Sequence, residues 1–307
     1  MNNHQLLLIS IFSFTFFSSC HATVMTDEEI YMSKLKWIAL FKEPNLPKIK
    51  RRVETGSLPI NWIDGNGIKC SYLPSALSRA AGKQSDFFNS GNTNKEAILH
   101  KQKQWGIVRY LLSKNASLCE KDKARSGNLS RYAVSQPSIL EQLLKRGDDP
   151  NRFIIDNGDQ FYTYDELHNP MPYQQTALSF ALRLQPAKKR YKVIKILLKY
   201  GASATNLDTH PTESPYYIPI ISEGMYQQNT SLEWRLKIVK LLIRYGAKIK
   251  VLTYTKDGKK RCSYQAAIFE KQARERNESE MLVLWKKYNA NDPYKYCTPD
   301  DFSQDRK

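Results

Sequence analysis

A nine-residue pattern of apolar and polar positions recurs along the chain. It is clearest at residues 193–201 (VIKILLKYG) and 238–246 (IVKLLIRYG), and looser copies occupy residues 107–115, 139–147 and 281–289. In each copy, pairs of apolar residues recur four residues apart, which predicts the buried face of an amphipathic helix. Each copy ends on Gly or Asn, which readily adopt the left-handed conformation that ends a helix. Because a short helix cannot bury its apolar face alone, the repetition predicts a stack of similar helical units.

The blocks and their flanking residues resemble ankyrin repeats. Residues 201–204 and 246–249 match the "G-A-x-x" tail of the family's second helix, and residues 176–181 (TALSFA) match its first-helix signature "T-P-L-H-x-A". Residues 75–80 (SALSRA) are a second copy of that signature. The resemblance implies an all-α, ankyrin-type helical repeat solenoid with extended β-hairpin fingers and about five or six units over residues 45–291.

Three Asp-Gly or Asn-Gly pairs lie between the helical blocks, each flanked by β-forming residues. Such pairs favour tight hairpin turns, so we expect fingers at residues 60–67, 153–164 and 251–261. The resemblance implies that a protein partner contacts the finger tips and the concave face of the first helices. The alternative, in which the same side chains pack between fingers, stays open. The candidate partner-binding residues are Trp62, Asp64, Asn66, Asp159, Phe161, Tyr162, Tyr164 and Tyr254.

Residues 1–22 are expected to be a secretory signal. Residues 6–17 are apolar except for Ser and Thr, and this run is too short to span a bilayer, which needs about 20 residues. Two products remain open. Cleavage after Ala22 would release a soluble protein, whereas residues 17–20 (FSSC) resemble a bacterial lipobox that would anchor the protein through a lipid on Cys20. Both products predict an exported protein, and we expect it in the periplasm.

Residues 23–44 are expected to form an N-terminal helix or cap. Thr26 and the acidic residues after it are a helix-start signal. Its predicted buried face comprises Ile30, Tyr31, Leu35, Trp37, Ile38 and Phe41. The repeats follow, and residues 292–307 are expected to be a polar C-terminal tail.

Four cysteines remain besides Cys20. An even number in an exported chain favours disulfide bonds. The repeat arrangement implies the pairs Cys70–Cys119 and Cys262–Cys297, because Cys70 and Cys262 precede first helices and the others follow the next second helix. Free buried thiols are the alternative. No cysteine has zinc-ligand spacing, so no metal site is expected.

The chain is basic, with 47 Lys and Arg against 30 Asp and Glu. Part of this excess recurs at the third and seventh positions of the helical blocks, so stacking would align it in a basic row. This row is either a solvated face or a surface for an acidic partner, such as an anionic membrane or an acidic protein. Export disfavours nucleic acid as the partner. The basic row comprises Arg109, Lys145, Lys195, Lys199, Lys240, Arg244 and Lys287.

The sequence contains none of the nucleophile, phosphate-binding or metalloprotease motifs sought. We therefore expect a monomeric, non-catalytic protein-interaction module of the bacterial cell envelope, without a cofactor. Exported bacterial ankyrin proteins are similar to immunity proteins, so one expectation is an inhibitor that binds a cognate toxic effector. The alternatives are an envelope scaffold on an anionic membrane surface and a secreted, host-directed effector.

Overall fold

The computed structural model describes residues 22–82, 95–118, 129–152, 162–164, 170–172, 176–204, 230–247, 250–254, 260–264 and 272–290. These residues are mostly helical. The helices are α1 (Asp27–Lys42), α2 (Leu46–Glu54), α3 (Leu73–Ala81), α5 (Lys95–Ser113), α6 (Leu129–Ala133), α7 (Pro137–Lys145), α8 (Ala177–Leu182), α9 (Ala187–Lys199), α11 (Leu232–Arg244) and α13 (Ser279–Ala290). The strands are β1 (Thr23–Val24), β2 (Asn61–Ile63), β3 (Lys69–Ser71), β4 (Tyr162–Tyr164), β5 (Pro170–Pro172), β6 (Lys250–Tyr254) and β7 (Lys260–Tyr264).

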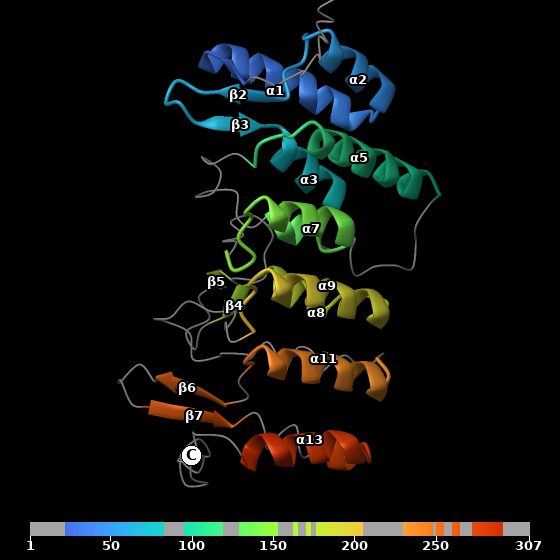
Figure 1. The fold of residues 1–307 in the computed structure, drawn as a ribbon, viewed down its shortest axis with the longest axis vertical. Helices are drawn as coiled ribbons and strands as arrows, with labels where there is room; N and C mark the ends of the chain where they lie inside the picture. The colour runs from blue at the N-terminus through green and yellow to red at the C-terminus, as the bar shows by residue number, and fades with distance from the viewer. Residues whose placement is uncertain are drawn as a thin grey trace, which may run out of the picture.

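The helices form an elongated stack of layers (Figure 1). We name α3, α6 and α8 the first helices, and α5, α7, α9, α11 and α13 the second helices. Within a layer, α3 packs on α5, α6 on α7, and α8 on α9. Between layers, α3 contacts α6, α6 contacts α8, and α7, α9 and α11 follow one another. The core therefore runs continuously from layer to layer.

The apolar pattern predicted the buried faces of the second helices correctly. In α9, Val193, Ile194, Leu197 and Leu198 are at most 2% exposed. The corresponding apolar residues of α11 are also buried. Burial of each such side chain contributes about 1.5–3 kcal/mol, so these faces supply most of the adhesion between layers.

The expected helix ends also occur in four of the five blocks. The backbone is in the left-handed region at Asn115, with φ of 55°, and at Gly147, Gly201 and Gly246, with φ of 87–89°. After Gly201, the Ala202 N–H donates to the Leu197 carbonyl at 2.9 Å, which satisfies a carbonyl at the helix end. In the fifth block the expected end was wrong, because α13 continues to Ala290. Asn costs a helix well under about 1 kcal/mol, so it does not by itself force a stop.

Helix α1 begins with the predicted capping box between Thr26 and Glu29. Its buried face was predicted only in part. Trp37 and Phe41 are buried, whereas Tyr31 is 60% and Leu35 is 42% exposed. Ser33 and Leu40 are buried in their place, because the face centred on Trp37 follows the i±3 and i±4 positions of that residue.

Two of the three fingers have the expected strands. Strand β2 pairs antiparallel with β3, placing Trp62 opposite Cys70, and β6 pairs antiparallel with β7, placing Leu252 opposite Cys262. The sequence did not predict β1, a two-residue strand that pairs parallel with β2.

The middle finger differs from its prediction. We expected Tyr162–Tyr164 to be the second strand of a hairpin that begins at residue 153. It is instead the first strand of a pair with Pro170–Pro172. The two prolines alternate with Met171, so both missing N–H groups fall on one side of β5, as an edge strand allows. Residues 153–161 lie outside the described part of the chain.

None of the described helices is long and apolar enough to cross a membrane.

Candidate protein-binding surface

All described strands lie on one side of the column of second helices (Figure 1). We call this the finger side. It comprises the first finger (β2–β3), the middle finger (β4–β5) and the last finger (β6–β7). Fingers that stand in a row on a helical stack form an extended surface, and the layers beneath them fix their spacing.

Two asparagines connect successive layers at the base of this side. The Asn61 side chain donates to the Asn115 carbonyl at 3.3 Å and accepts from the Ser117 N–H at 2.7 Å. One layer pair further on, the Asn151 side chain donates to the Gly201 carbonyl at 2.8 Å and accepts from the Ser203 N–H at 2.6 Å.

In both cases the side chain reaches across to the turn that ends the next second helix. We call each pair of hydrogen bonds an asparagine clamp. The clamps satisfy backbone groups that the helix end leaves free, and they hold the base of one finger against the following layer.

Two residues expected at the partner surface belong to the interior. Trp62 is 8% exposed, and its ring centroid lies 4.4 Å from that of Tyr72 in a tilted contact; Tyr72 also contacts Trp37. Asp64 is 5% exposed, and its Oδ1 accepts hydrogen bonds from the N–H groups of Asn66 and Ile68, both at 3.0 Å. These two side chains build the finger and its turn, so they do not present themselves to a partner.

Asn66 is exposed at the tip of the first finger, as the sequence predicted. Asp159 and Phe161 lie outside the described residues. Tyr162, Tyr164 and Tyr254 lie in β4 and β6, but the structure describes only their backbone. The structure therefore brings Asn66 to the surface and leaves the partner-binding role of the tyrosines a prediction.

The first helices add candidates that the sequence did not single out. Arg79 on α3 is exposed, and Arg131 and Tyr132 on α6 are half-buried. The guanidinium carbon of Arg131 lies 4.3 Å from the ring centroid of Phe180 on α8, which is a cation–π contact between layers. Arg79 is the fifth residue of the first-helix signature at residues 75–80, and this position is the signal that could have identified it.

A buried polar chain runs through the last three layers, on the side of the core near the helix starts. Arg190 is fully buried, and its Nε donates to the Leu184 carbonyl at 2.7 Å and its Nη1 to the Thr230 hydroxyl at 3.0 Å. Burial lowers the pKa of Arg190 to about 10. The next link is Arg235, whose Nε donates to the Thr230 carbonyl at 3.2 Å and whose two Nη groups donate to the Glu278 carboxylate.

A half-buried carboxylate marks the layer of α6 and α7. The Asp148 Oδ2 accepts from the Ser130 N–H at 2.7 Å and from the Ser130 hydroxyl. Burial raises the pKa of Asp148, and the hydrogen bonds from Ser130 oppose that rise. The carboxylate binds the first turn of α6 and so connects that helix to the turn after α7.

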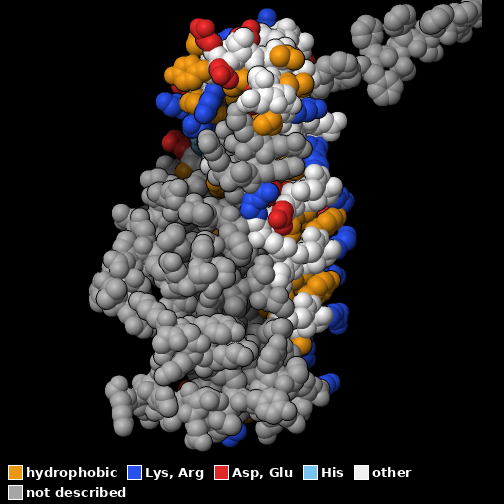
Figure 2. All heavy atoms as spheres, turned by 90° about the vertical axis from the view of Figure 1, so that its left-hand side faces the viewer, with side chains coloured by type: hydrophobic (Ala, Val, Ile, Leu, Met, Phe, Trp, Pro, Cys, Tyr) orange, Lys and Arg blue, Asp and Glu red, His pale blue; other side chains and the backbone are white. Residues whose placement is uncertain are grey.

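The predicted basic row lies on the exposed faces of the second helices. In Figure 2 the finger side faces the viewer, and Lys and Arg side chains line one edge of the molecule from layer to layer. Glu141 interrupts the row, since its Oε1 lies 3.8 Å from the Nζ of Lys145 and 3.6 Å from the Nζ of Lys199. All seven residues of the row are exposed.

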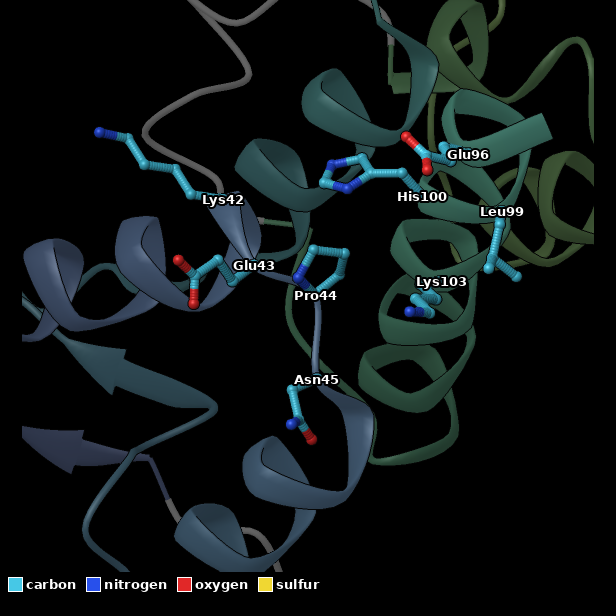
Figure 3. A pocket seen from close by; sticks show the side chains of 8 residues that line it. All are labelled: Lys42, Glu43, Pro44, Asn45, Glu96, Leu99, His100 and Lys103. Atoms are coloured by element: carbon cyan, nitrogen blue, oxygen red, sulfur yellow. The ribbon is translucent and has the colours of Figure 1, made fainter. Parts of the chain in front are cut away.

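A shallow hollow lies where the loop after α1 meets α5 (Figure 3). Its volume is about 430 Å³, and Lys42, Glu43, Pro44, Asn45, Glu96, Leu99, His100 and Lys103 line it. Lys42 and Leu99 point away from the other side chains rather than into a shared space. The hollow does not present convergent polar groups of the kind that orient a small ligand.

Cys70 is disulfide-bonded. Its expected partner, Cys119, lies outside the described residues, so the pairing stays a prediction. So does the pairing of Cys262 with Cys297. Within the described ranges, no group of three or more His, Cys, Asp or Glu side chains could hold a metal ion.

No protein-family model matches the chain, and no curated protein matches it.

Proposed function

We propose that the chain is an exported, ankyrin-type repeat protein that binds another protein and performs no catalysis. The support for the repeat assignment is that the same devices recur in successive layers. The helix ends at Asn115, Gly147, Gly201 and Gly246 all lie in the left-handed region, and the asparagine clamp occurs twice between equivalent groups. Recurrence of both features at matched positions is what a repeat stack requires.

The observation that carries the binding function is the alignment of the fingers on one side of the stack (Figure 1). The Asn61 clamp fixes the base of the first finger on the next layer, and a base that is fixed before a partner arrives lowers the conformational entropy lost on binding. Arg and Tyr side chains, such as Arg79, Arg131 and Tyr132, are the types that most often carry interface energy. The proposed contact surface is therefore the exposed part of the finger tips together with the exposed positions of the first helices.

The proposed partner is a toxic effector that the protein blocks, which would make it an immunity protein of the bacterial envelope. The support for this finer proposal is the ankyrin resemblance together with the secretory signal expected at residues 1–22. The envelope location follows from the same signal, with either a soluble periplasmic product or a lipid anchor at Cys20.

Site-specific photo-crosslinking tests the binding proposal. A photoreactive amino acid is placed at one position at a time: Asn66 or Lys69 of the first finger, or Arg79 of α3. The exposed positions Lys195 and Arg244 of the second helices serve as controls. The full chain is expressed in its own source, irradiated in intact cells, and analysed by mass spectrometry. We expect one protein to crosslink at the finger or first-helix positions and not at the controls.

Two further outcomes decide the proposal. Crosslinking of that protein only from the second helices would place the binding surface elsewhere and overturn it. If the captured protein is an enzyme or toxin, the purified chain should inhibit it at stoichiometric concentration, and a lack of inhibition would reject the immunity role while leaving the binding role intact.

A further inference from the structure

Helix α9 carries a face made entirely of lysine. Lys188, Lys192, Lys195 and Lys199 are spaced four, three and four residues apart, which places them on one side of the helix. All four are exposed, whereas the apolar residues of the helix are buried on the opposite side. The helix contains no acidic residue, so no carboxylate on α9 offsets these charges.

The neighbouring second helices extend this face. In α11, Lys237, Lys240 and Arg244 occupy the same positions 45 residues later and are also exposed. Helices α9 and α11 pack side by side, so their charges lie next to one another. Lys145 continues the face on α7, which also packs on α9. We name these eight residues the basic ridge, and they are Lys145, Lys188, Lys192, Lys195, Lys199, Lys237, Lys240 and Arg244.

Only two carboxylates lie on the exposed faces of these three helices. Glu233 contacts the Lys237 Nζ at 2.5 Å, and Glu141 lies between Lys145 and Lys199. Both contacts are solvent-exposed, and such pairs are weak and screened by salt. The ridge therefore retains a large positive excess over three layers, which Figure 2 shows as basic side chains along one edge.

The amino-acid composition of the basic ridge favours a lipid surface over a protein as its partner. Seven of the eight residues are lysine, which is depleted in specific protein interfaces, whereas Arg is enriched there. Within the described parts of α7, α9 and α11 and their ends, the only large apolar residue that is highly exposed is Tyr245, at 43%. The ridge thus lacks the desolvated apolar centre that holds a protein partner. A dense set of exposed, hydrated lysine charges instead fits a surface of anionic lipid headgroups.

We propose that the basic ridge docks this protein on an anionic lipid bilayer surface. The inference goes beyond the proposed protein-binding function, since it concerns a different face. The ridge lies on the second helices, whereas the described strands lie on one side of them (Figure 1), so a bilayer on the ridge leaves the finger side uncovered. Each basic residue near such a surface strengthens binding by a factor of about five, so several residues acting together give a strong, salt-dependent affinity.

Vesicle partitioning tests the proposal. The full chain is mixed with phosphatidylcholine vesicles that contain either no or about 30% phosphatidylglycerol. The ridge variant changes Lys188, Lys192, Lys195 and Lys199 to Gln, which preserves helix propensity. The control variant changes four other exposed lysines, Lys34, Lys36, Lys42 and Lys48, to Gln, so it has the same net charge. Circular dichroism confirms that both variants fold.

We expect the ridge variant to lose at least about 50-fold in affinity for the anionic vesicles, because each removed charge contributes a factor of about five and not all reach the surface equally. The control should change less than about threefold, and binding should collapse between about 0.05 and about 0.5 M salt. Binding to neutral vesicles reports any contribution of the apolar N-terminal segment, and it should be equal for all three proteins.

An equal loss in both variants would show that net charge alone acts, and unchanged binding in the ridge variant would show that the ridge does not touch lipid. Either result overturns the proposal. So does a ridge variant that binds lipid normally but loses a crosslink to an acidic protein formed from position 244. Because crosslinking from Asn66 does not depend on the ridge, a failure here leaves the finger-side function separately testable.

Discussion

The buried pair of Arg235 and Glu278 makes the sharpest prediction about stability. The two side chains are each 8% exposed, and the Arg235 Nη1 lies 3.0 Å from the Glu278 Oε2 while its Nη2 donates to Oε1. The pair joins the layer of α11 to the segment that begins α13. Replacing Glu278 with Ala leaves a buried guanidinium without its carboxylate, so the free energy of unfolding should fall by about 3–5 kcal/mol.

The same chain offers a matched control. Glu233 and Lys237 form a pair on α11 whose side chains are 68% and 47% exposed. Glu233→Ala likewise removes the carboxylate partner of a basic residue, Lys237, but this pair is exposed to solvent. The free energy of unfolding should therefore fall by less than about 1 kcal/mol. The double variant Arg235→Met, Glu278→Leu should recover most of the loss, because it removes both buried charges together.

Urea denaturation followed by fluorescence measures these differences, with Trp285 as the local reporter, since it is fully buried in α13. Repeat stacks can unfold layer by layer, so amide hydrogen exchange of residues 279–290 should accompany it and should rise selectively in Glu278→Ala. A loss below about 1 kcal/mol, equal to that of the control, would refute the view that this pair holds the last layers together.

Four further outcomes follow from the described contacts. Asn61→Ala should cost about 2 kcal/mol in urea denaturation, because it removes two hydrogen bonds to part-buried backbone groups of the next layer; a cost under about 0.5 kcal/mol would contradict the clamp. Gly201→Ala should cost about 1–2 kcal/mol from the left-handed φ of 89° alone, since no atom lies within 4 Å of the added Cβ, and a neutral effect would contradict this. Burial raises the pKa of Asp148 in the folded state, so the unfolded chain loses this proton at a lower pH than the folded chain does. Stability should therefore fall as the pH rises from the unfolded-state pKa of Asp148 through its folded-state pKa. Asp148→Asn should flatten this fall, and an unchanged pH profile of stability would reject the prediction. Peptide mapping without reductant should recover Cys70 linked to Cys119, and a different partner would refute the pairing that the repeats imply.

The sequence predicted the second helices well because their period is local. The apolar residues of 193–201 and 238–246 are buried as expected, and Gly201 and Gly246 end those helices in the left-handed region. Periodicity and helix-end chemistry act within about ten residues, so a single sequence contains the information.

The first finger shows where that information ends. Trp62 sits opposite Cys70 in a local hairpin that the sequence predicted, but its burial depends on Trp37 and Tyr72, which belong to other elements. No local pattern distinguishes an aromatic residue at an exposed tip from one in a cluster built by three segments. The sequence therefore placed the strand of Trp62 correctly but did not predict that its side chain is buried.

The buried polar chain was missed for a different reason. Arg190, Arg235 and Glu278 each stand three residues before an apolar block, so they occupy equivalent positions in successive layers. Charged residues at a helix start are usually solvated, and the sequence shows no sign that these are buried. The sequence did contain one signal of a salt bridge, since this repeated position is Arg in two successive layers and Glu in the next. That change indicates a contact only once the layers are known to stack.

Affinity capture tests the central claim, that the finger side binds one protein partner, most directly. Three proteins are used to capture partners from an envelope extract of the native source, with washes at about 0.15 M and about 1 M salt. They are the full chain, a finger-side variant with the exposed residues Asn66, Lys69 and Arg79 changed to Ala, and the lysine-to-Gln ridge variant. The account predicts one stoichiometric protein that resists high salt with the full chain and the ridge variant and is lost with the finger-side variant, at unchanged melting temperature. Retention of that protein by the finger-side variant, or a set of proteins that all elute with salt, would contradict it.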